Sequence, residues 1–151
     1  MPKVNYWAIV VAAALAFVAS SVWYIVFGPA WLELRGIDAS TVASTRPQVG
    51  EVLGQLVRNL VVAYVLARLI SRLEIVDWKG AIRLAIWVWI GFQAMAIVGS
   101  VLHEGYPWQL YDIHVGDALV STLVMAIVLG VWRMRQSSRL SKVIGGSGAT
   151  L

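Results

Sequence analysis

The chain has 151 residues, of which 60% are hydrophobic and 13% are charged, and this composition excludes an ordinary soluble domain. Its formal net charge is +4, but the basic residues gather at the ends of apolar segments, which argues against a nucleic-acid partner. The absence of cysteine excludes disulfides, thiolate metal sites and cysteine nucleophiles.

Four apolar segments reach the length of about 20 residues that a helix needs to cross a bilayer. The spans are expected at about 6–27, 51–72, 81–102 and 113–133. We therefore predict an all-α fold, an integral membrane bundle of four transmembrane helices within residues 1–136. Residues 137–151, which end in GGSGATL, are expected to form a flexible tail.

The first span carries a stripe of small residues, because Ala8, Ala12, Ala16 and Ser20 recur every four positions. Such a stripe favours close packing of helices in a membrane. After this span, residues 28–50 form the one long connection. Within it, 31–35 suggest a short interfacial helix ended by Gly36. The connection is either an amphipathic surface loop or a lid over the second span.

The second span carries the strongest functional signal. Glu51, Gln55, Arg58 and Asn59 lie at positions 0, +4, +7 and +8, within an arc of roughly 100° on a helix. An arginine facing lipid costs on the order of 3 kcal/mol. We therefore expect Arg58 to be buried and paired, with partial snorkelling to the interface as the alternative.

The last two spans offer partners for Arg58. Gln93 and Glu104 share one face of the third span, and Asp117 lies about one turn inside the fourth, on the same face as Ser121. Glu104 and Asp117 are the expected partners, in a pair that either locks helices together or helps to bind a ligand. Trp87 and Trp89 lie deeper in the third span than an interfacial belt, so at least one should pack between helices.

The run 103–117 contains His103, Glu104, Asp112, His114 and Asp117, which are residue types that bind divalent metals. Their spacing fits no metalloprotease signature, so we expect no metal and no cofactor. No serine has an evident histidine and acid partner. We therefore name no catalytic residue, and an enzyme is the less favoured class.

The basic residues are distributed unequally between the two sides of the predicted bundle. One side holds nine: Lys3, Arg68, Arg72, Lys79, Arg83, Arg133, Arg135, Arg139 and Lys142. The other side holds two, Arg35 and Arg46. Because basic residues favour the inner side, both termini are predicted to be cytoplasmic.

Short motifs run through nearly the whole chain. They are Asn5-Tyr6-Trp7, Trp23-Tyr24, Phe27-Gly28 with Trp31, Glu104-Gly105, and Leu129-Gly130-Val131-Trp132. On these motifs the chain resembles the bacterial membrane family known as domain of unknown function 1761. The resemblance implies a four-helix protein of the bacterial cytoplasmic (inner) membrane, and it brings no established activity.

Three hypotheses about function follow. The first is a transporter or sensor component with an outward-facing polar pocket that binds a small polar or anionic ligand through Gln55, Arg58, Asn59, Gln93, Glu104 and Asp117. The second is a non-catalytic accessory subunit of a larger membrane complex or a homo-oligomer. The third is a metal-dependent membrane enzyme.

Overall fold

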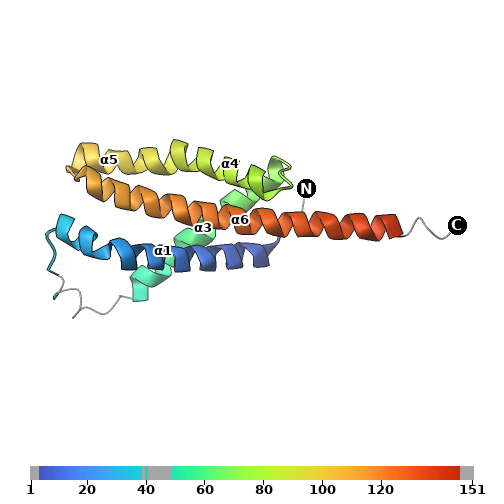
Figure 1. Cartoon of the computed structure of the whole chain (residues 1–151), viewed down its shortest axis with the longest axis horizontal. Coiled ribbons are helices and arrows are strands. Elements are labelled where there is room, and N and C mark those ends of the chain that lie inside the picture. Colours follow the sequence, from blue (N-terminus) through green and yellow to red (C-terminus); the bar gives the residue numbers. More distant parts are fainter. Residues whose placement is uncertain (1–3, 39, 41–48, 147–151) are drawn as a thin grey trace.

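The computed structural model describes residues 4–38, 40 and 49–146, and within them the secondary structure is entirely helical. The helices are α1 (Tyr6–Leu34), α3 (Val49–Arg72), α4 (Trp78–Val88), the π-helix η1 (Trp89–Ala94), α5 (Met95–Glu104) and α6 (Trp108–Gly146). α4, η1 and α5 form one continuous rod, so the described residues contain four helices long and apolar enough to cross a membrane. The predicted all-α, four-span fold is confirmed (Figure 1).

The first helix is longer than predicted. Its start is capped by the side chain of Asn5, which accepts hydrogen bonds from the backbone N–H groups of Trp7 and Ala8. It then continues through Pro29 to Leu34, so the prediction of a separate short helix over 31–35 is wrong. A proline removes only one helical N–H, and the residues after it are able to continue the helix. The predicted stop at Gly36 is correct, with a left-handed φ of +63°. The lid alternative falls largely on residues 39 and 41–48, outside the described residues.

The small-residue stripe of α1 is buried against neighbouring helices, in agreement with the predicted close packing. Ala8, Ala12, Ala16 and Ser20 are all buried, and α1 lies against both α6 and α3. The main apolar cluster joins the first half of α1 to the second half of α3, the middle of α6 and α4, through residues such as Leu66, Ile70, Met125 and Leu129. The end of the bundle that holds the chain's N-terminus is therefore closed by apolar side chains.

The rod formed by α4, η1 and α5 contains an irregularity that the sequence did not predict. Residues Trp89–Ala94 form a π-helix, in which extra residues per turn change the register between the flanking α-helical segments. The indole of Trp89 donates to the carbonyl oxygen of Val115 at 2.9 Å, whereas Trp87 is 68% exposed. The expectation that one of the two tryptophans packs between helices is confirmed by Trp89.

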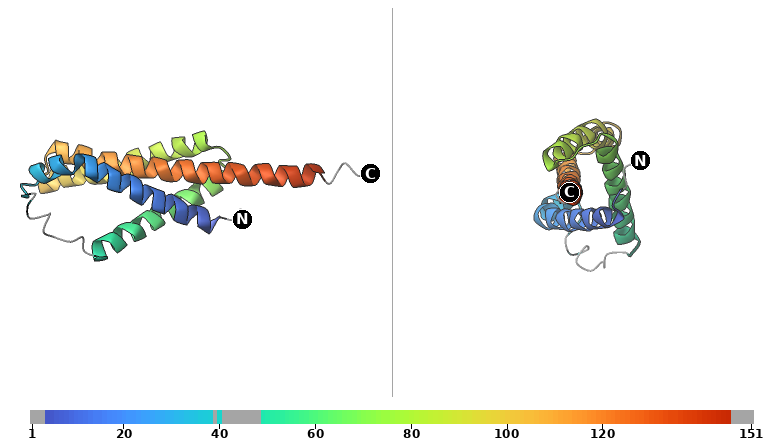
Figure 2. Two further views of the ribbon diagram at one scale, coloured as in Figure 1. Left: turned by 60° about the horizontal axis from the view of Figure 1, so that its bottom comes forward. Right: turned by 90° about the vertical axis from the view of Figure 1, so that its right-hand side faces the viewer.

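α6 is the central element of the bundle. It contacts α1, α3, α4, η1 and α5, and it runs beyond the other helices at its C-terminal end (Figure 1). Residues 137–146 of the predicted tail continue this helix, and 147–151 lie outside the described residues. α3 is steeply inclined to α1 and α6, and its first turns diverge from the rest of the bundle (Figure 2). This inclination creates the space described below.

Candidate functional site

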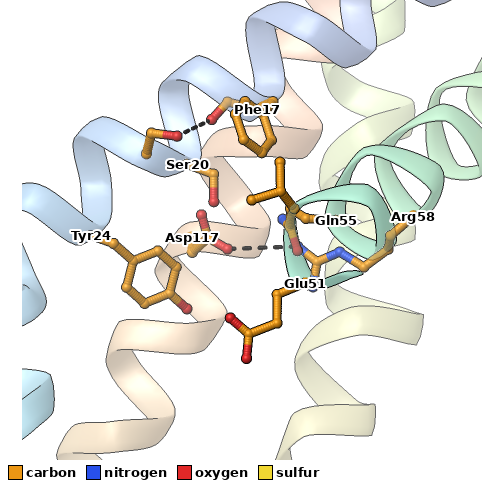
Figure 3. Close-up of a pocket in the computed structure, with 9 residues that line it drawn as sticks. Phe17, Ser20, Tyr24, Glu51, Gln55, Arg58 and Asp117 are labelled. Carbon is orange, nitrogen blue, oxygen red and sulfur yellow. Dashed lines mark hydrogen bonds and ion pairs between the residues drawn. The ribbon is translucent and has the colours of Figure 1, made fainter. Parts of the chain in front are cut away.

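A pocket of about 460 Å³ opens between α1, the first three turns of α3, and α6. Figure 3 shows the polar side chains of the three helices converging on it. It is lined by Phe17, Ser20, Ser21, Tyr24, Glu51, Val52, Gln55, Arg58 and Asp117. On α1 the pocket residues (17–24) directly follow the residues of the apolar cluster (8–16), so apolar side chains border the pocket on the side where α1 begins.

Asp117 is the buried charge of the site. Its side chain is only 6% exposed, and its Oδ2 lies 3.8 Å from Nη2 of Arg58. Among the residues that the structure describes, its Oδ1 has no hydrogen-bond partner, and neither does Oγ of Ser121 one turn farther along α6. A buried carboxylate oxygen without a partner is costly, so the site can accept a hydrogen bond or a proton at this position.

Arg58 pairs with one of its two predicted partners, but the prediction that it is buried is wrong. Its side chain is 57% exposed. The cause is the divergence of the first turns of α3, where neighbouring Leu53 and Val57 are also more than half exposed. The separation of 3.8 Å exceeds a hydrogen-bond distance, so Asp117 does not occupy the guanidinium donors with strong hydrogen bonds.

α1 fixes the position of Asp117 through three contacts that Trp23 and Tyr24 make with the preceding turn of α6. The Trp23 indole donates to the carbonyl oxygen of Ile113 at 3.0 Å, and its ring lies directly over Gly116, where a Cβ atom would come within 2.5 Å of it. One residue farther along α1, the Tyr24 hydroxyl is 2.9 Å from Nδ1 of His114. These contacts set the rotation of α6 that turns Asp117 toward α3.

The structure separates the six predicted ligand-binding residues. Gln55, Arg58 and Asp117 line the pocket, whereas Asn59 is buried beside it at 2% exposure. Gln93 is hydrogen-bonded to Thr122 of α6 at 2.9 Å. Thr122 follows Asp117 by five residues, about 140° around the helix.

Gln93 and Glu104 therefore do not share the pocket of Arg58. They belong to the rod that packs on another face of α6, and Glu104 is exposed, with one oxygen 3.4 Å from Ser100 Oγ. The sequence predicts where polar residues lie along each helix, but it does not predict which face of α6 each helix covers.

Three lining residues have roles that the sequence did not assign. Ser20 is part of the small-residue stripe, and Glu51 was recognised as polar, but neither carried a signal for the pocket itself. Tyr24 could not have been found, because its partner His114 lies 90 residues away in the chain.

The acidic and histidine residues of the 103–117 run do not converge. Within residues 4–38, 40 and 49–146, no three histidine, aspartate or glutamate side chains form a group that could hold a metal ion. His103 is exposed at the end of α5, and His114 is engaged by Tyr24. The arrangement can bind and orient a polar solute, and it offers no metal centre in this part of the chain.

Comparison with known proteins gives one result. Residues 7–130 match the family model described as "Protein of unknown function (DUF1761)", which covers all four membrane helices up to the middle of α6. No curated protein and no solved structure matches the chain. The chain is therefore a multi-pass membrane protein that belongs to the DUF1761 family.

Proposed function

We propose that this protein binds a small organic anion in the pocket around Arg58, as a component of a transporter or a sensor. The observation that carries the proposal is the exposed guanidinium of Arg58 at the wall of a 460 Å³ pocket. An arginine within a membrane helix is a functional candidate by default, because its charge is costly there. The pocket is also within the volume range of small-ligand sites.

The charges of the pocket favour a monovalent carboxylate over phosphate. Among the residues that the structure describes, the lining contains one basic residue, Arg58, and two acidic ones, Glu51 and Asp117. A multiply charged phosphate would be repelled by both carboxylates, whereas one carboxylate matches the planar fork of one guanidinium. Gln55, Ser21 and the hydroxyl of Tyr24 supply further hydrogen-bonding groups.

We place the mouth of the pocket on the outer side of a bacterial cytoplasmic membrane. The support is the distribution of nine basic residues against two, which favours cytoplasmic termini. With four spans, the Arg35 end of α1 then lies outside.

The experiment is a binding measurement on the purified protein in detergent, with benzoate and inorganic phosphate as probes. Benzoate should raise the melting temperature of the wild type, and phosphate should not. Arg58→Gln should abolish the benzoate effect. Arg35→Gln is the matched control, since it removes the same charge from the same end of the bundle, where Arg35 bonds Tyr106 instead of the pocket, and it should keep the effect. Equal responses of the two variants, or no response of the wild type, would contradict the proposal.

An exposed small-residue stripe and a fixed ion pair without a cavity would favour the accessory-subunit hypothesis. Instead, the stripe is buried within the chain, and the ion pair lines a pocket. These observations favour the binding function over the accessory role.

A further inference from the structure

We propose that the pocket takes up a proton on Asp117 together with the organic anion, so that the pair enters as the equivalent of a neutral acid. This inference rests on the proposed function, and it specifies how the same site handles charge. It follows from the fact that Asp117 and a bound carboxylate would compete for a single cation.

The competition arises because the charge of Arg58 is shared. In the described part of the lining the Arg58 guanidinium is the one basic group, and it faces Asp117 at 3.8 Å. A bound carboxylate that takes a bidentate position on Arg58 needs the same donors. Asp117 would then be a second negative charge beside the ligand, and the Arg58 guanidinium would no longer neutralise it.

Burial decides which group must be neutralised. Asp117 is 6% exposed, so an unpaired carboxylate there would lose hydration without any replacement, and such a group takes up a proton instead. The protonated form also suits the site better, because it becomes a hydrogen-bond donor beside the unpartnered Ser121 hydroxyl on the same face of α6.

Other titratable groups near Asp117 are less suited to this role. From α3, Glu51 is exposed and keeps its hydration. From α1, the Tyr24 hydroxyl is engaged with His114, the titratable neighbour on α6. The polar groups that η1 directs at α6, Trp89 and Gln93, do not titrate and are hydrogen-bonded elsewhere.

The proton balance of the step is simple. One proton leaves the aqueous phase, one O–H bond forms on the Asp117 carboxyl group, and no electron moves. The described lining of the pocket contains one positive and two negative side chains before binding. It keeps the same total charge after the anion and the proton have both entered.

The test is calorimetry of benzoate binding in buffers of different ionisation enthalpy, at pH values where benzoate itself stays ionised. Wild-type protein should take up close to one proton per benzoate, and its Kd should rise by up to about tenfold per pH unit. Asp117→Asn, which keeps the shape without the titration, should take up no proton and bind benzoate with a Kd independent of pH. Glu51→Gln and His114→Gln remove the other titratable side chains near Asp117; whatever their effect on affinity, each should still take up close to one proton per bound benzoate.

The outcomes are distinguishable. Benzoate binding without proton uptake by the wild type would overturn this inference and leave the proposed function standing, and so would uptake that is lost in Glu51→Gln or His114→Gln instead of Asp117→Asn. Absence of benzoate binding would overturn the proposed function itself. If Asp117→Asn does not fold, the wild type and the two control variants still decide, since uptake kept in both controls supports Asp117 and uptake lost in either contradicts it.

Discussion

Asp117 and Arg58 form an ion pair with one buried and one exposed member, and this asymmetry determines how substitutions should behave. Removing the exposed arginine leaves a buried carboxylate without compensation, whereas removing the carboxylate leaves an arginine that still reaches solvent. A variant that loses Arg58 and keeps Asp117 should therefore be less stable than a variant that loses Asp117 and keeps Arg58.

A double-mutant cycle tests this asymmetry. Arg58→Leu should lower the free energy of unfolding by about 1–3 kcal/mol, the usual cost of an unsatisfied buried group. The ion pair itself adds nothing to this range, because water screens the exposed guanidinium of Arg58. In an Asp117→Asn background the same change should cost less than about 0.5 kcal/mol. Unfolding in detergent measures both values.

Glu104 supplies the control for this cycle. Because it lies outside the pocket, Glu104→Gln should show a coupling to Arg58→Leu below about 0.5 kcal/mol. A larger coupling of Arg58 to Glu104 than to Asp117 would contradict the geometry of the site.

Gly116 gives a second prediction at a single position. A methyl group there would meet the Trp23 ring at 2.5 Å, so Gly116→Ala should destabilise the protein by about 1–3 kcal/mol through overpacking. Gly99→Ala is the matched control, since its Cβ would have no neighbour within 4 Å, and it should be neutral or slightly stabilising. Equal melting temperatures of the two variants would refute the close contact of α1 with α6.

At the scale of helices, composition predicted the elements well because a membrane span is specified by length and hydropathy alone. The sequence also identified Arg58 as a candidate site residue, because it is a charged residue among the apolar residues Val57, Leu60 and Val61. The continuation of α1 through Pro29 and the π-helix at 89–94 were missed. Both depend on tertiary contacts and on local backbone geometry that single residues do not encode.

The arrangement of helices predicts separate roles for the two polar groups of α6. Gln93→Ala removes the hydrogen bonds to Thr122 and should cost about 1 kcal/mol in stability. It should leave benzoate binding unchanged, because Asp117 faces α3 and Thr122 faces η1. Ser100→Ala, on the exposed part of the same rod, should change neither property. A loss of benzoate binding in Gln93→Ala would show that η1 contributes to the site.

For the whole molecule, the unequal distribution of basic residues predicts the orientation in the membrane. The chain has no cysteine, so single cysteines can be labelled cleanly in intact cells. His103→Cys, at the end of α5, should react with an impermeant thiol reagent, and Ser137→Cys, on the extension of α6, should react only after the cells are opened. Both positions are exposed. The opposite pattern would reverse the proposed orientation.

If the Arg58–Asp117 pocket is a binding site, water and small solutes should reach it from one side of the membrane. Ser21 lines this pocket, whereas Val18, nearly one turn earlier on α1, is 56% exposed but does not line it. We expect Ser21→Cys to react with a charged, water-soluble thiol reagent added to intact cells, benzoate to slow this reaction several-fold, and Val18→Cys to stay unreactive in lipid. If Ser21→Cys is as inert as Val18→Cys, no aqueous pocket exists there, and the proposed binding function is wrong.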